Sequence, residues 1–222
     1  MRLLDLYCGA GGAAMGYHRA GFDVVGVDIK PQPRYPFKFV QADALAFPLD
    51  GYDAIHASPP CQAFSAAGNI WKGRLPDERH PDLIGATRAR LLAAGVPYVI
   101  ENVPRAPLES PVTICGLALG LNVRRHRDFE CSFPAMVPPC TGHDRDYLIV
   151  FGGGTRQRGH QIGRTANDGP ILRRGTVPIA EAKAAMGIDW MNRDELSQAI
   201  PPAYTEHIGH YLMAEIRARA AA

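Results

Sequence analysis

The stretch RLLDLYCGAGG, residues 2–12, decides the fold. Its first six residues are a short, mostly apolar run that predicts a strand, and the glycines directly after it predict a tight turn. Residues 13–20 then have helical character and end at Gly21. The segment therefore predicts a strand, a glycine-rich turn and a helix.

Further strands follow along the first half of the chain. We expect them at residues 23–27, 37–41, 52–57 and 98–100, with a helix at 82–94 before the last. Strands that alternate with helices predict a parallel sheet with right-handed crossovers. The predicted fold class is α/β, with a doubly wound, mostly parallel sheet.

The second half of the chain is less regular. Prolines and glycines interrupt residues 131–175, where only 147–151 predicts a strand, and helical character returns at 179–186 and from 204 onward. We therefore expect one domain in three parts. They are a core with the cofactor and catalytic residues over 1–130, a short arginine-rich, loop-rich insert over 131–176, and C-terminal helices returning to the core over 177–222.

The composition limits the possible partners and the compartment. The net charge is only +2, but residues 122–175 hold nine arginines, no lysine and five acidic residues, so a polyanion is expected there. No apolar stretch reaches the roughly 18 residues of a membrane span, and the N-terminus lacks a signal peptide's apolar core. The five cysteines show no disulfide framework, which predicts reduced thiols and a cytoplasmic protein.

Chemically useful residues follow the predicted strands, where α/β sheets bind ligands. Asp28 and Asp43, together with the glycine turn, favour a cofactor that contains adenosine, although each acid alone could be a solvated strand-end residue. In SPPCQAFS, residues 58–65, two prolines restrict the backbone before Cys61, which is either an exposed nucleophile or a buried structural cysteine.

Two further groups lie beyond these motifs. Glu101 begins the sequence ENVP and could bind a base edge or act as an acid, or else form a helix cap or salt bridge. The arginines of RRHRDF, residues 124–129, would alternate along an extended segment, or would form a solvated charged run.

The order and spacing of these motifs resemble the DNA cytosine-5 methyltransferases. Residues 5–12, 58–65 and 101–103 and the Arg125-x-Arg127 pair are similar to that family's successive signature motifs. Residues 181–188 and 197–202 are similar to its last two. The resemblance covers nearly the whole chain.

This resemblance implies a Rossmann-like fold that binds S-adenosylmethionine, and a mechanism on a base flipped out of DNA. Cys61 would add to carbon 6 of cytosine, which activates carbon 5 for methylation. Glu101 would hold and protonate N3, Arg127 would contact the base carbonyl, and Arg125 would support Arg127.

The resemblance also implies two sets of binding residues. Those assigned to the cofactor are Asp5, Tyr7, Gly9, Ala10, Gly11, Gly12, Asp28, Ile29, Asp43, Ala44, Pro60 and Gln198. Those assigned to DNA are Gln62, Ser65, Lys72, Arg74, Arg79, Arg156, Arg158 and Arg164. The expected partner is duplex DNA, bound by a monomer in a bacterial or phage-infected cell, with or without a cognate restriction enzyme.

The chain departs from the family pattern at three points. Val123 stands where many members have Gln, Gln198 stands where most have Asn, and only about 50 residues separate Arg127 from Glu181. A short insert predicts recognition of a short DNA sequence, or loose recognition. The same chemistry on RNA, single-stranded DNA or a free deoxycytidine nucleotide stays open, as does a non-catalytic module that shields cytosines.

Part of the insert has residues that could bind a metal. Cys131, Cys140 and His143, with His126 or His160 as a fourth ligand, have a spacing that could bind zinc. The spacing is not a standard one, so we expect these residues to pack the loop and expect no metal.

Overall fold

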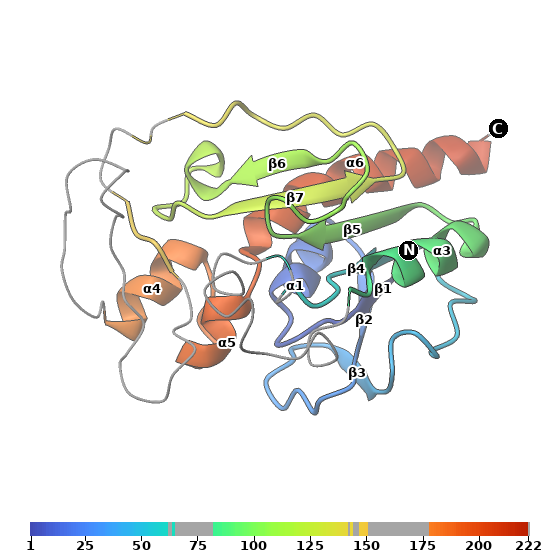
Figure 1. Ribbon diagram of the computed structural model, residues 1–222, viewed down its shortest axis with the longest axis horizontal. Helices are drawn as coiled ribbons and strands as arrows, with labels where there is room; N and C mark the ends of the chain where they lie inside the picture. The colour runs from blue at the N-terminus through green and yellow to red at the C-terminus, as the bar shows by residue number, and fades with distance from the viewer. Residues whose placement is uncertain (62–63, 65–81, 142, 144–146, 151–177, 222) are drawn as a thin grey trace.

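The computed structural model describes residues 1–61, 64, 82–141, 143, 147–150 and 178–221 (Figure 1). Its centre is a seven-stranded sheet in the order β3-β2-β1-β4-β5-β7-β6. The first five strands in this order are parallel, whereas β7 is antiparallel to β5 and to β6. The strands are β1 Arg2–Leu6, β2 Asp23–Asp28, β3 Lys38–Gln41, β4 Ala54–Ala57, β5 Tyr98–Asn102, β6 Val112–Cys115 and β7 His126–Cys131. The predicted α/β class is confirmed.

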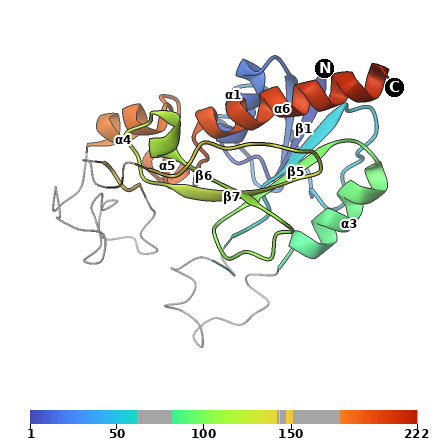
Figure 2. The same ribbon diagram turned by 90° about the horizontal axis from the view of Figure 1, so that it is seen from above.

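Helices cover both faces of the sheet, with α1 and α6 on one face and α3 on the other (Figure 2). The helices are α1 Gly12–Arg19, α3 Ile84–Ala94, the 3₁₀ helix η2 Gly116–Leu119, α4 Ile179–Met186, α5 Arg193–Gln198 and α6 Pro202–Ala221. No helix in the described ranges is both long and apolar enough to cross a bilayer.

The alternation of side chains along β1 explains the two-sided core. Leu3 packs in the cluster that includes residues of α1 and α6, whereas Leu4 and Leu6 pack in the cluster that includes Leu91 of α3. Successive side chains of a strand point to opposite faces, so a strand buried on both sides is apolar on both. Asp5 is the exception, because its carboxyl lies on the α1 and α6 face of the sheet, fully buried.

Close packing of α6 on α1 returns the C-terminal segment to the core. A Cβ atom on Gly16 would lie 2.1 Å from the Pro202 carbonyl oxygen and 2.1 Å from Thr205 Oγ1, so only glycine fits there. The Thr205 hydroxyl donates to the Ala13 carbonyl over 2.8 Å. These contacts join the two ends of the chain on one face of the sheet.

The second half of the chain differs from the sequence-based expectations. The strand expected at 147–151 is wrong over its described residues, where a single parallel bridge joins Leu148 to Val123. Strands β6 and β7 and helix α5 were not predicted as regular elements, although the extended arginine segment becomes β7. All five cysteines lie within the described residues, and each is a free thiol.

Candidate active site

A buried row of polar side chains crosses the sheet on the face covered by α1 and α6. The Tyr17 hydroxyl and His56 Nδ1 are hydrogen bonded at 3.0 Å, and His56 Nε2 and Ser58 Oγ at 2.8 Å. Ser58 in turn hydrogen bonds to the Glu101 carboxyl. Burial lowers the pKa of His56 to about 3, so its ring is neutral at physiological pH. The row connects helix α1 to the end of β5.

Hydrogen bonds fix the Pro-Pro-Cys turn to the ends of two neighbouring strands, β1 and β5. The Ser58 amide donates to the Leu6 carbonyl over 3.1 Å, and Asn102 Nδ2 donates to the Pro59 carbonyl over 2.9 Å. Asn102 is 1% exposed, so its hydrogen bond to Pro59 is made inside the protein, where hydrogen bonds are stronger than in water. The two bonds hold Cys61 at the carboxyl edge of the sheet between β4 and β5.

The Cys61 thiol is half-buried and has charged neighbours. Burial raises its pKa, while the positive charge of Arg127 opposes that rise, and the negative charge of Glu101 adds to it. Cys61, Glu101 and Arg127 therefore interact in one cluster. In the ligand-free protein the sulfur is held mainly as a thiol.

Glu101 and Arg127 form a buried ion pair. Arg127 Nε lies 3.0 Å from Glu101 Oε1, and the two side chains are 15% and 7% exposed. Oε1 has no aligned hydrogen bond, so the contact is electrostatic and leaves the oxygen able to bond to another group. Burial raises the pKa of Glu101 and outweighs the opposing charge of Arg127. The carboxyl group therefore keeps its proton to a higher pH than a solvated glutamate.

Arg125 has a different environment from Arg127. Its guanidinium donates to the Val150 carbonyl over 2.6 Å and to the Ser197 carbonyl over 2.8 Å. Burial lowers the pKa of this guanidinium to about 9. These bonds place Arg125 as a side chain that positions β7 against the segments around Val150 and α5.

The glycine turn after β1 has an open side. Gly9 has a φ of 49°, and a Cβ atom there would meet no atom within 4 Å. The Gly9 amide donates to Asp28 Oδ2 over 3.0 Å, and the Lys30 amide donates to Asp28 Oδ1 over 2.9 Å. Helix α1 follows, and no side chain makes a cap hydrogen bond at its N-terminus. Ile29, beside Asp28, is 66% exposed.

Comparison with known proteins shows what the first part of the chain is similar to. Residues 1–106 match the family model described as C-5 cytosine-specific DNA methylase. The first part of the chain is therefore similar to that family. It includes the glycine turn, Cys61 and Glu101.

Two curated relatives and two solved structures extend the comparison. Type II methyltransferase M1.HphI of Haemophilus parahaemolyticus is 31% identical over 119 residues, which are 46% of this chain and 32% of that protein. Type II methyltransferase M.FnuDI of Fusobacterium nucleatum is 32% identical over 80 residues, which are 32% of this chain and 23% of that protein. The matched stretches thus span a third or less of these relatives.

The solved structures agree in fold over nearly their whole length. A Spodoptera frugiperda DNMT2 mutant has a TM-score of 0.63 at 13% identity and covers 96% of this chain and 99% of its own. The S. pombe Dnmt2 methyltransferase has a TM-score of 0.62 at 14% identity and covers 97% and 99%. At such identities the likeness establishes the Rossmann-like methyltransferase fold alone.

Within this fold, the residues assigned to the cofactor have varied surroundings. Asp5 is fully buried, where burial raises its pKa well above the usual range, and Tyr35 donates to its Oδ2 over 3.4 Å. The Tyr7 hydroxyl is hydrogen bonded to Thr87 Oγ1 at 3.0 Å. Trp190 Nε1 donates to the Ala10 carbonyl over 2.8 Å, a contact from the C-terminal segment that the sequence did not indicate.

The other assigned cofactor residues lie near three further strand or helix ends. Asp43 is exposed and its Oδ1 accepts from the Leu45 amide over 2.9 Å, while Ala44 beside it is buried. Pro60 is half-buried, and Gln198 is exposed at the end of α5. Gly11 and Gly12 complete the turn before α1.

The residues assigned to DNA lie outside the described residues. They are Gln62, Ser65, Lys72, Arg74, Arg79, Arg156, Arg158 and Arg164. Their roles remain predictions from the resemblance.

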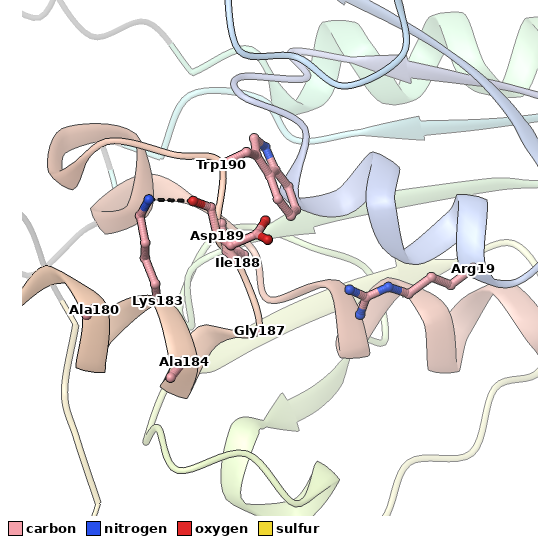
Figure 3. A pocket seen from close by; sticks show the side chains of 8 residues that line it. All are labelled: Arg19, Ala180, Lys183, Ala184, Gly187, Ile188, Asp189 and Trp190. Carbon is pink, nitrogen blue, oxygen red and sulfur yellow. Dashed lines mark hydrogen bonds between the residues drawn. The ribbon is translucent and has the colours of Figure 1, made fainter.

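A separate hollow lies between the end of α1 and the loop after α4 (Figure 3). It has a volume of about 470 Å³ and is lined by Arg19, Ala180, Lys183, Ala184, Gly187, Ile188, Asp189 and Trp190. Lys183 Nζ donates to the Asp189 carbonyl at its rim. None of the assigned catalytic or binding residues lines this hollow, so we assign no chemistry to it.

His56 and Tyr17 are the site residues that sequence reasoning missed. His56 lies in β4, two residues before Ser58, which directly follows that strand, and side chains two apart along an extended chain share a face. That alternation could have placed His56 on the face of the site. Its hydrogen bond to Tyr17 of α1 could not be predicted, because it depends on how the helix packs.

Proposed function

We propose that this protein transfers a methyl group to carbon 5 of cytosine in DNA. The observation that carries the proposal is the single cluster of Cys61, Glu101 and Arg127 at the carboxyl edge of the sheet. A thiol, a protonatable carboxyl group and a fixed cation are the groups needed to activate a pyrimidine ring for attack at carbon 5. The family that residues 1–106 match supports the same assignment.

The thiol and the carboxyl act on opposite edges of the ring. The Cys61 sulfur donates an electron pair to carbon 6 and forms a C–S bond, and the displaced C5–C6 electrons make carbon 5 nucleophilic. Glu101 donates its proton to N3 and offsets the charge that arrives on the ring. Carbon 5 would take the methyl group of S-adenosylmethionine, which would leave as S-adenosylhomocysteine. A base then takes the proton of carbon 5, the C–H electrons restore the C5–C6 double bond, and the C–S bond breaks with its electron pair on sulfur. Cys61 is released as a thiolate, and Glu101 takes its proton back from N3.

The positive charge of Arg127 acts on both Cys61 and Glu101. Its charge favours the Cys61 thiolate and holds the Glu101 carboxyl in place, and its remaining donors would contact the carbonyl oxygen of the base. Because carbon 6 is inaccessible in a duplex, the base has to leave the stack, which costs a few kcal/mol.

The residues around the glycine turn fit the expected methyl donor. S-adenosylmethionine supplies an electrophilic methyl group on a positively charged sulfur. Asp28 still has lone pairs for ribose hydroxyls, exposed Ile29 offers an apolar surface for a base, and the open side of Gly9 admits a ligand against the backbone.

The proposed organisation places catalysis in residues 1–130, DNA recognition in the insert 131–176, and support in residues 177–222. The partner is duplex DNA, approached by a monomer. A cognate restriction enzyme is in keeping with the Type II relatives.

Covalent trapping tests this proposal. The chain is incubated with S-adenosylmethionine and duplex DNA in which 5-fluorocytosine replaces cytosine, since fluorine at carbon 5 blocks release of the enzyme. A stable protein–DNA adduct is expected with the wild type and none with Cys61→Ser, which is matched by Cys131→Ser as a control. Absence of an adduct would favour a non-catalytic module that shields cytosines.

A substrate panel defines the nucleic acid. Methyl transfer is measured on duplex DNA, its separated strands, RNA and deoxycytidine monophosphate, and bisulfite sequencing then maps the methylated sites. The highest rate is expected on duplex DNA. Activity on the mononucleotide alone would overturn the DNA assignment but not the chemistry of Cys61.

A further inference from the structure

A second cluster of cysteine and histidine side chains lies at the β6 and β7 end of the sheet. Cys115 ends β6, His126 begins β7, and Cys140 and His143 lie in the segment after β7. Each offers one ligand atom, and the four atoms lie within 4.8 Å of one another. Three separate parts of the chain thus bring two sulfurs and two imidazole nitrogens to one point.

The distances in this cluster are close to those of a tetrahedral metal site. Cys115 Sγ is 3.5 Å from His143 Nε2, and Cys140 Sγ is 3.1 Å from His126 Nε2 and 3.2 Å from His143 Nε2. Zinc bonds of about 2.3 Å to sulfur and about 2.0 Å to nitrogen place neighbouring sulfur and nitrogen atoms about 3.6 Å apart. Only small shifts of the side chains are needed to admit an ion at the centre.

We propose that Cys115, His126, Cys140 and His143 bind one zinc ion in a closed structural site. Two thiolates and two neutral imidazoles are a ligand set that zinc prefers, and four protein ligands leave no open position for catalysis. Cys115 is buried and Cys140 is exposed, so the site sits at the protein surface with one side inside the core.

Hydrogen bonding alone is a weak reason for this convergence. A thiol is a poor donor and acceptor, and the His126 and His143 rings meet edge to face with centroids 5.3 Å apart. A metal ion satisfies all four groups at once.

The ligand set differs from the one considered from the sequence. Cys131, the last residue of β7, is not in the cluster and instead packs against the core, while Cys115, 25 positions before Cys140, takes its place. Cys115 was missed because it becomes a neighbour of Cys140 only when β6 pairs with β7.

The site would hold the described first part of the insert against the sheet. Residues 147–150 follow His143, and they bridge to Val123 and supply the Val150 carbonyl that binds Arg125. A zinc ion at Cys140 and His143 therefore holds these residues against β7. It stabilises the side of the protein that carries the arginine pair, without touching the catalytic groups.

Metal binding by the full chain tests the proposal. The reduced protein is titrated with zinc against a chromophoric chelator, and the zinc content after dialysis is measured by mass spectrometry. One zinc per chain is expected, and cobalt in its place should give the visible absorption of a tetrahedral site with two thiolates. Cys140→Ser changes an exposed ligand, and it should weaken zinc binding at least about 100-fold.

Two controls make the result decisive. Cys131→Ser removes a cysteine of β7 outside the cluster, and His210→Gln removes an exposed histidine of α6, so both should keep one zinc. The melting temperature should rise with zinc in the wild type and both controls but not in Cys140→Ser. The proposal is overturned if the wild type binds no zinc against the chelator. Loss of zinc in Cys131→Ser to the same extent as in Cys140→Ser, or a Cys115–Cys140 disulfide under reducing conditions, would overturn it equally.

Discussion

His126 and Arg127 are consecutive residues of β7, yet they belong to two different cysteine sites. Arg127 faces Cys61 and Glu101, where burial raises the thiol pKa, whereas His126 faces Cys115, where imidazole neighbours lower it. Because neighbouring side chains of a strand point to opposite faces, one strand can serve both sites without mixing them. The comparison teaches that the neighbours of a cysteine decide how easily its thiol loses its proton, and with it which chemistry the sulfur can carry out.

The largest effect that would separate the two sites is expected from Glu101→Gln. The amide keeps the shape of the side chain but has no acidic proton to transfer to N3, so the rate of methyl transfer should fall about 10²- to 10⁴-fold. Single-turnover methylation of duplex DNA measures this, and zinc binding should stay at the wild-type level. A rate within threefold of wild type, on the order of measurement scatter, would remove Glu101 from the mechanism.

The pH dependence of the same variant gives a second readout. In the wild type the protonated fraction of Glu101 decreases as the pH rises through its raised pKa, so the proton-donating step slows in that direction. An amide does not titrate in this range. The Glu101→Gln rate should therefore lack that decrease.

The next effect concerns stability on the active-site side alone. His56→Phe leaves the Tyr17 hydroxyl and Ser58 without their buried partner, which should lower the free energy of unfolding by about 1–3 kcal/mol. Urea unfolding at pH 7 measures the loss, and Tyr17→Phe, which removes one of the two bonds, should lose less. Equal stability of wild type and His56→Phe would show that these hydrogen bonds make no net contribution to the free energy of unfolding.

The pH dependence of stability follows from the same histidine. Its folded pKa of about 3 lies below the unfolded value, so the unfolded chain binds the extra proton as the pH falls from about 6.5 toward 3. Wild-type stability should fall by about 1.4 kcal/mol for each pH unit in this window from this group. His56→Phe should lack that contribution.

The sequence predicted the active-site side well because its signals are local. The strand, glycine turn and helix of residues 2–20 are contiguous. Cys61 follows β4 and Glu101 lies near the end of β5, and the apolar runs of these strands are visible without a structure. Parallel strands place their carboxyl ends at one edge, so the convergence of these residues could be expected.

The zinc side could not be predicted in the same way. Strand β7, HRDFEC, has no apolar alternation to mark it, because Asp128 pairs with Thr113 and Glu130 pairs with Arg88. Those partners are 15 and 42 positions away in the chain. The ligand set depends on the same pairing of β6 and β7, which is a tertiary property and leaves no local pattern.

A smaller effect is expected when the positive charge beside Cys61 is removed. Arg127→Met removes a positive charge beside Cys61, which should raise the pKa of that thiol further and slow its alkylation by iodoacetamide about 3- to 10-fold near neutral pH. Arg127→Lys keeps the charge and should react more nearly as wild type. Peptide mass spectrometry resolves the sites, and Cys140 in the same sample is the internal reference. If Cys61 and Cys140 slowed together, the charge of Arg127 would not be specific to the active site.

The smallest effect is expected from Cys131→Ser, because Cys131 shares β7 with both sites and belongs to neither. Its half-buried side chain packs against the core, and a hydroxyl there should lower the free energy of unfolding by about 1 kcal/mol or less. Thermal unfolding measures that change, while trapping by 5-fluorocytosine DNA and zinc content should match the wild type. Loss of trapping would mean that the substitution also displaces Arg127 in the same strand. Loss of zinc would mean that it displaces His126. Retention of both functions would show that the two sites depend on their own side chains and not on the strand that carries them.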